Sequence, residues 1–159
     1  MEKEKIGVRG EVSYVLTDKD GKVKEEKKVT NQIQNLGLAA IASLIATDNP
    51  QSETAFDYMA IGSGNGQLVT DTALATEITT AGGGRRGGAD VVASSATTTV
   101  ANDTVQFVTT WSFTGPLSIT EAGILNATPA GTMLAYQDFS VINVANGDNL
   151  QITWKIVFA

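Results

Sequence analysis

Two segments near the C-terminal end of the sequence alternate apolar and polar residues with a period of two. In a β-strand successive side chains point to opposite faces, so this period predicts two strands that each bury one face. The predicted buried faces carry Val105, Phe107, Thr109, Trp111 and Phe113 in the first segment, and Leu150, Ile152, Trp154, Ile156 and Phe158 in the second. We predict that the two tryptophans anchor a hydrophobic core.

Other parts of the second half of the chain are also rich in β-forming residues. The runs span residues 91–100, 117–125 and 133–144, and turn-forming residues stand at 101–103, 128–131 and 146–149. Several strands joined by short turns favour an antiparallel arrangement. We therefore predict a mainly β protein, an antiparallel β-sandwich of the jelly-roll type that one main helix closes at one end.

A single segment shows convincing helical periodicity. Apolar residues fall at Leu38, Ile41, Ala42 and Ile45, and an asparagine at position 31 or 35 is suited to cap the start. This spacing predicts a helix near residues 35–46. Because the apolar stripe is wide, we expect it to face the core.

Charge is concentrated in the first 28 residues, of which 15 are charged. Apolar residues alternate up to Leu16, and Asp20-Gly21 then gives a strong hairpin signal. We predict that residues 1–28 form a charged β-hairpin arm and that residues 29–159 form the body. The second strand of this hairpin is mostly polar and is expected at a sheet edge. Its lysines are candidate contacts for a partner: Lys22, Lys24, Lys27 and Lys28.

The body of the chain is sparsely charged and acidic, with three basic residues against ten acidic ones. Such a surface lacks the charge density that keeps free monomers apart, so we expect contact with other protein. Nucleic-acid binding is disfavoured because a phosphate backbone requires clustered lysine and arginine. We expect no membrane contact and no targeting segment, since no apolar run reaches the roughly 18 residues of a membrane span.

The sequence contains neither cysteine nor histidine. This excludes disulfides, thiol nucleophiles, zinc sites with these ligands and Ser-His-Asp catalysis. The carboxylates of the body are scattered singly, and we therefore expect no enzyme activity, no cofactor and no metal site. The run Gly62-Ser63-Gly64-Asn65-Gly66 fits neither the dinucleotide fingerprint nor a P-loop, which leaves a flexible turn.

Residues 81–88 hold five glycines around Arg85 and Arg86. Glycine makes regular structure costly, so this segment is predicted to be a loop that presents two guanidinium groups. They are candidate contacts with a partner or another subunit, and a solvated loop tip is the equally weighted alternative. Glu121 lies within an apolar strand run and would need a partner if buried. We expect Arg85 or Arg86 to supply it, in a structural ion pair or a subunit contact.

Seven runs of the body together form a longer pattern. They are Val29-Thr30-Asn31, Leu36-Gly37-Leu38-Ala39-Ala40-Ile41-Ala42, Tyr58-Met59-Ala60-Ile61-Gly62-Ser63-Gly64, Asp71-Thr72-Ala73-Leu74-Ala75-Thr76-Glu77-Ile78, Ile119-Thr120-Glu121-Ala122-Gly123-Ile124-Leu125-Asn126, Gly131-Thr132-Met133-Leu134-Ala135 and Gly147-Asp148-Asn149-Leu150-Gln151-Ile152-Thr153-Trp154-Lys155-Ile156. This pattern, over residues 29–159, resembles a module of tailed-bacteriophage virion proteins.

The resemblance implies a structural function and no catalytic site. Proteins of this kind serve as head decoration proteins, head fibres and tail-fibre components, usually as symmetric oligomers. We expect a virion protein that cements the head, with the major capsid protein and further copies of itself, in a trimer, as partners. The alternative is a tail-fibre or receptor-binding module of the virion.

Overall fold

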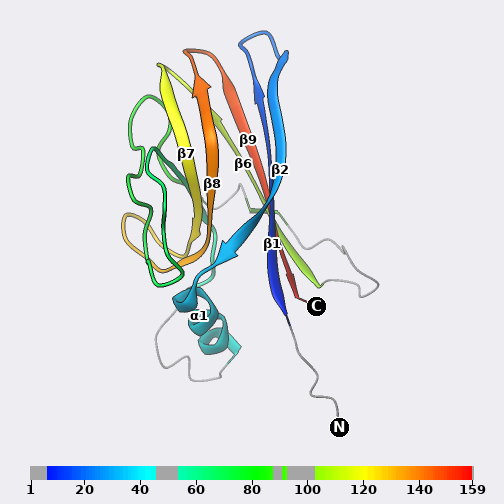
Figure 1. The fold of residues 1–159 in the computed structure, drawn as a ribbon, viewed down its shortest axis with the longest axis vertical. Coiled ribbons are helices and arrows are strands. Elements are labelled where there is room, and N and C mark those ends of the chain that lie inside the picture. The colour runs from blue at the N-terminus through cyan, green and yellow to red at the C-terminus, as the bar shows by residue number, and fades with distance from the viewer. Residues whose placement is uncertain (1–6, 46–53, 88–90, 93–102, 159) are drawn as a thin grey trace.

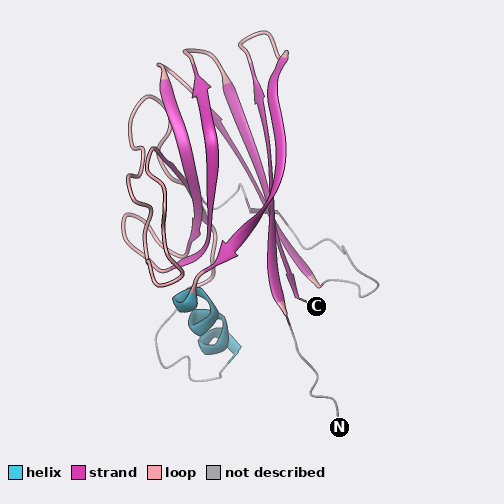
Figure 2. Cartoon of the chain, viewed as in Figure 1, coloured by secondary structure: helices cyan, strands magenta, loops and turns pink. Residues whose placement is uncertain are grey.

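The computed structural model describes residues 7–45, 54–87, 91–92 and 103–158. In this part of the chain nine strands surround a core and one helix lies at one end (Figure 1). The elements are β1 Val8–Thr17, β2 Val23–Ile33, α1 Asn35–Ile45, β3 Tyr58–Gly62, β4 Arg86–Gly87, β5 Val91–Val92, β6 Thr104–Ser112, β7 Leu117–Leu125, β8 Met133–Val144 and β9 Asn149–Phe158. Strands dominate the cartoon in Figure 2.

The strands form one sheet in the order β4-β3-β7-β8-β2-β1-β9-β6-β5, and every pair is antiparallel. This sheet is nearly closed and barrel-like, with β7 and β8 opposite β1, β9 and β6 (Figure 1). The predictions of a mainly β protein with antiparallel strands, one helix and an N-terminal hairpin are confirmed. The jelly-roll sandwich is not confirmed. Residues 93–100 of the predicted strand 91–100 lie outside the described part.

Strand β2 joins the two halves of the sheet because it changes partner along its length. Residues 23–31 pair with β1, whereas only Gln32 and Ile33 pair with β8, at Tyr136 and Ala135. At the opposite side, the loop before β4 bonds to β6 and the turn that follows it. The indole Nε1 of Trp111 donates to the carbonyl of Gly84 at 2.9 Å, and Thr114 N donates to Ala81 O at 3.0 Å. These bonds bring the two ends of the sheet together.

The core fills the interior of this curled sheet. Trp111 and Trp154 are both fully buried, which confirms their predicted role as core anchors. Val12, Tyr14 and Leu16 of β1 are buried in the same cluster. Strand β1 lies between β2 and β9 and pairs with β9 from Val8 to Thr17. The hairpin, from Val8 onward, is therefore built into the sheet, and its first strand shares one core with the body.

Helix α1 begins at Asn35 as predicted, but of its predicted core-facing stripe only Ile41 packs against the core. Leu38 and Ile45 were expected to face the core, yet they are 43% and 81% exposed. The buried positions are Gly37, Ala40 and Ser43. The reason is close backbone packing, since a Cβ on Gly37 would lie 2.6 Å from Cα of Leu134 on β8. The small side chains thus face the sheet and Ile41 packs partly against the core, whereas the other large side chains of the helix are exposed.

Among the described residues, no helix has the length and apolar character that crossing a membrane would require.

Candidate functional site

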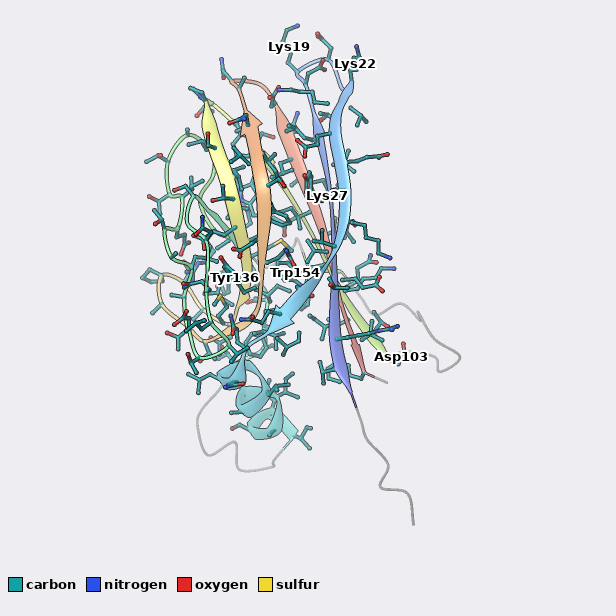
Figure 3. The ribbon with its side chains drawn as sticks, in the orientation of Figure 1. Lys19, Lys22, Lys27, Asp103, Tyr136 and Trp154 are labelled. Atoms are coloured by element: carbon teal, nitrogen blue, oxygen red, sulfur yellow. The ribbon has the colours of Figure 1, made fainter. Side chains whose placement is uncertain are left out.

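The four lysines predicted as partner contacts all lie on or next to β2, but they divide into two pairs. Lys24 and Lys28 are engaged within the chain, Lys24 with Asp148 and Lys28 with Glu11, where Nζ lies 2.7 Å from Oε2. Lys22 and Lys27 are exposed and form no ion pair within the described part of the chain (Figure 3). Two of the four predicted contacts are therefore exposed and outside any ion pair among the described residues.

The ion pair of Lys24 stabilises the turn between β8 and β9. The side chain of Asp148 is only 6% exposed, and its Oδ2 also accepts a hydrogen bond from Ala145 N at 2.9 Å. The hydrogen bond from Lys24 lowers the pKa of Asp148, with a smaller contribution from the Ala145 amide, while burial acts in the opposite direction. The hydrogen bond from Lys28 likewise lowers the pKa of Glu11. The bond of Lys24 fastens the hairpin to the turn between β8 and β9, whereas that of Lys28 joins the two strands of the hairpin.

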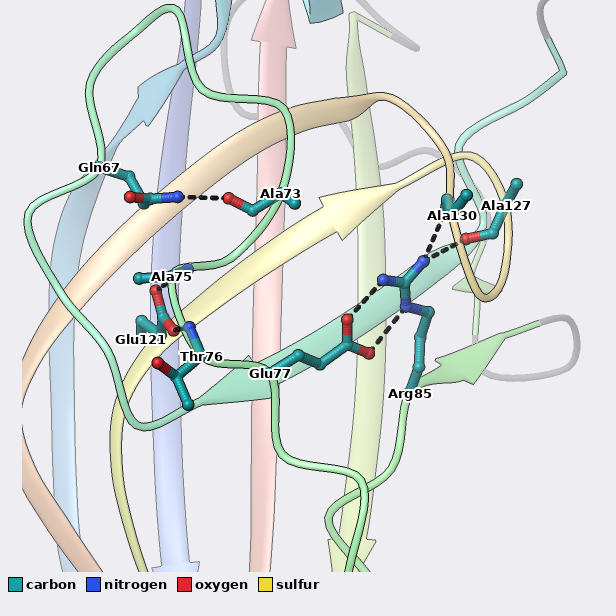
Figure 4. A network of polar contacts seen from close by, with 9 residues as sticks. All are labelled: Gln67, Ala73, Ala75, Thr76, Glu77, Arg85, Glu121, Ala127 and Ala130. Atoms are coloured by element: carbon teal, nitrogen blue, oxygen red, sulfur yellow. Dashed lines mark hydrogen bonds and ion pairs between the residues drawn. The ribbon is translucent and has the colours of Figure 1, made fainter.

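Glu121 is fully buried on β7, but the predicted arginine partner is wrong. Its Oε1 accepts hydrogen bonds from Gly64 N at 3.0 Å and Thr76 N at 2.8 Å, and its Oε2 accepts one from Ala75 N at 3.1 Å. Backbone amides therefore satisfy this carboxylate (Figure 4). A Cβ on Gly62 would lie 2.4 Å from Oε1, so the glycines of the 62–66 turn make room for the carboxylate.

Asp138 lies opposite Glu121 in the pairing of β7 with β8. It accepts a hydrogen bond from the hydroxyl of Tyr136, and a longer one of 3.4 Å from Gly66 N. Burial raises the pKa of Tyr136, and the bond to Asp138 adds to this shift. Both carboxylates therefore tie the 62–78 segment to the sheet. Among the described residues, no group of three Asp or Glu side chains is placed to hold a metal ion.

Arg85 connects three segments of the chain from a nearly buried position, with its side chain 6% exposed. Its Nε and Nη2 donate to the carboxylate of Glu77 at 3.0 and 2.6 Å. Its Nη1 donates to the carbonyl oxygens of Ala127 and Ala130 in the loop between β7 and β8 (Figure 4). The geometry is the bidentate pairing for which arginine is suited, and it is used within the chain.

Arg86 is placed differently from its neighbour. Its Nη2 donates to Gly82 O at 3.2 Å, and its buried Nε has no hydrogen-bond partner in the described residues. The loop before it is confined by contact with β6, because a Cβ on Gly82 would lie 2.2 Å from the carbonyl oxygen of Ser112. Gly82 also has a φ of +84°, which other residues rarely adopt. The structure brings neither arginine to Glu121.

Exposed apolar residues gather at the end of the sheet that α1 covers, and we call this surface the α1 end. Its exposed apolar residues are Leu36, Leu38, Leu44 and Ile45 of the helix, with Leu68 and Val69 beside the helix start, where Asn35 N donates to Val69 O at 2.8 Å. A groove of about 220 Å³ next to α1 is lined only by apolar residues, among them Ile41, Leu44, Phe56, Val105 and Phe158. This combination is a candidate protein-binding surface.

The absence of charge from α1 is a sequence signal for this surface, and helical periodicity alone did not identify it. Residues 35–45 contain no charged residue, so the helix has no polar face for water. A helix that is apolar all round is normally buried on every side. On this chain it is packed on one side only.

Comparison of the chain with family models, with curated proteins and with solved structures gave no match.

Proposed function

We propose that this chain is a non-enzymatic structural protein of a tailed-phage virion, which decorates and cements the head shell as a homo-oligomer, a trimer. The observation that carries the proposal is the α1 end. Leu36, Leu38, Leu44 and Ile45 are each more than 40% exposed on a helix without charge. Burying apolar surface gains about 25 cal/mol per Å², so contact between copies would be favoured there.

Two further features support a structural function. The virion resemblance covers residues 29–159, where the motifs form part of α1 and strands, loops and turns of the sheet. The buried carboxylates Glu121 and Asp148 are occupied in holding loops to the sheet, as Glu77 is through Arg85. Groups engaged in this way serve stability.

In the proposed assembly the two ends of the sheet have different partners. Copies of the chain meet through the α1 end. At the other end, the hairpin end around the turn between β1 and β2, Lys22 faces the major capsid protein together with Lys27, which lies further along β2. Each contact of this kind is weak, and several subunits that engage neighbouring capsomers gain affinity through effective concentration. The chain would thus stabilise the shell from the virion surface.

Co-sedimentation with expanded empty capsids of the encoding phage tests this proposal. We expect stoichiometric binding of the chain to the capsids. The double variant Lys22→Glu with Lys27→Glu should bind the capsids more weakly and keep the same oligomeric state. Arg9→Glu is the matched control, because Arg9 is also exposed but lies at the start of β1, far along the strand from the hairpin turn. Absence of capsid binding, or binding only to host cells, would contradict capsid decoration, and the second result would favour the receptor-binding alternative.

A further inference from the structure

A second groove, of about 470 Å³, lies beside the α1 end and has a different chemistry. We call it the polar groove. One wall is formed by Thr54, Asp57 and Tyr58 at the start of β3, and the other by Asn126 and Thr128 in the loop after β7. The segment 54–58 separates the two grooves, since Phe56 lines the apolar one. Its volume suits one or two sugar-sized units, because small-molecule sites span about 300–1,000 Å³.

The loop that forms the second wall is held in place by the side chain of Arg85. Arg85, itself fixed by Glu77, donates to the carbonyl oxygens of Ala127 and Ala130 (Figure 4). Thr54 Oγ1 donates to Asn126 O at 2.7 Å and so joins the two walls. A preorganised loop binds a ligand without a large loss of conformational entropy, and a loop on a rigid scaffold is a common binding element.

Three polar groups in the groove have no partner among the described residues. They are the carboxylate of Asp57 and the hydroxyls of Tyr58 and Thr128. The ring of Tyr58 is packed against the backbone of Gly87, where a Cβ would lie 2.4 Å from Cδ1 and 2.5 Å from Cε1. The ring is therefore fixed in position at the groove, and the carboxylate next to it can accept hydrogen bonds.

We propose that the polar groove binds a neutral saccharide unit. A sugar presents hydroxyl donors to a carboxylate and apolar C–H groups to an aromatic ring, and Asp57 and Tyr58 supply this pair of groups. Asp57 is the single charged residue among those that line the groove, so a polycationic peptide finds too few partners. An acidic ligand meets repulsion from the same carboxylate. This inference is independent of the proposed capsid function.

Saturation-transfer NMR on the full chain tests the groove with three neutral probes: maltose, lactose and N,N′-diacetylchitobiose. We expect transfer to at least one of them at millimolar concentration. Asp57→Asn should weaken that binding about tenfold or more, since hydrogen bonds to charged groups are worth about 1.5–3 kcal/mol. Tyr58→Leu should weaken it similarly, whereas Tyr58→Phe keeps the ring and should cost less.

Asp20→Asn is the matched control, because Asp20 is exposed in the hairpin turn and its carboxylate contacts, among the described residues, only the neighbouring Lys19. Circular dichroism and amide chemical shifts show whether each variant remains folded, and shifts on titration show whether residues 54–58 are contacted. No transfer to any probe, or equal binding by wild type, Asp57→Asn and Tyr58→Leu, would overturn the proposal. Salt-sensitive binding of decalysine at the groove, with no sugar binding, would also overturn it.

Discussion

The two ends of the sheet expose different chemistry to solvent and are fastened in different ways. The hairpin end carries exposed charge, including Lys19 and Lys22, and its ion pair between Lys24 and Asp148 leaves the lysine 38% exposed. The α1 end exposes uncharged leucine and isoleucine, and its ion pair between Glu77 and Arg85 leaves the arginine only 6% exposed. One end therefore carries solvated charge, whereas the other leaves apolar side chains exposed, as the proposed contact between copies would require.

The strongest test of this difference is Arg85→Met, which removes the buried pair near the α1 end. We expect a loss of about 3 kcal/mol in the free energy of unfolding, because Glu77 and two loop carbonyls lose their donor together. Urea denaturation monitored by tryptophan fluorescence measures it. Arg86→Met is the matched control and should cost less, since Arg86 donates one bond, to Gly82. Equal losses of stability in the two variants would contradict the claim that the bonds of Arg85 stabilise the fold more than that of Arg86.

Asp148→Asn is expected to cost about 1–2 kcal/mol at neutral pH, because the turn loses its charged acceptor for Lys24 and Ala145. The pKa of Asp148 is lower in the folded than in the unfolded chain, so its stabilisation is present above the unfolded pKa of about 3.9. It is lost as pH falls through the lower folded value. The difference in Tm between wild type and variant should therefore shrink below about pH 4, and a difference that grows on acidification would contradict this.

Lys24→Met removes the cation from the same pair and is expected to cost only about 0.5–1 kcal/mol. Lys24 is partly solvated, and methionine retains the apolar part of its side chain. Thermal unfolding at low and at high salt measures the effect, which should be smaller at high salt because ions screen an exposed charge. A loss as large as that of Arg85→Met would remove the contrast between the two ion pairs.

Ile45→Lys should have the smallest effect on folding, within about 0.5 kcal/mol, because Ile45 is 81% exposed and the substitution leaves no cavity. Chemical denaturation at low protein concentration, where association contributes least, is the appropriate measurement. Ala40→Lys is the contrasting variant. Ala40 is fully buried on the same helix, so this substitution should strongly lower the free energy of unfolding. A large loss for Ile45→Lys would show that the exposed face of α1 already supports the fold of one copy.

Local patterns in the sequence predicted much of this fold. The period of two around Trp111 and Trp154, the Asp20-Gly21 turn and the start of α1 all follow from properties of neighbouring residues. The face that α1 presents to the sheet did not follow, because it depends on the approach of Gly37 to Leu134, far away in the sequence. Periodicity identifies the apolar residues of a helix, but a helix without charged residues has no polar face to orient it.

The candidate sites depended even more on contacts between distant segments. Sequence reasoning gave Glu121 an arginine partner, but backbone amides of Gly64, Ala75 and Thr76 satisfy it, and backbone amides are the same in every sequence. The polar groove was not predicted, because its two walls, residues 54–58 and 126–128, meet only in the folded chain. Arg85 was recognised as unusual, whereas the carbonyls that it binds were not.

Sedimentation equilibrium of the full chain, over micromolar to tens of micromolar concentration, tests most directly whether the α1 end is an assembly surface. Wild type should sediment as an oligomer. The double variant Leu38→Lys with Ile45→Lys should raise the dissociation constant of that oligomer about tenfold or more without changing the fold, because two apolar side chains would no longer be buried between copies. A wild type that remains monomeric throughout, or a double variant that sediments as the same oligomer, would contradict the account.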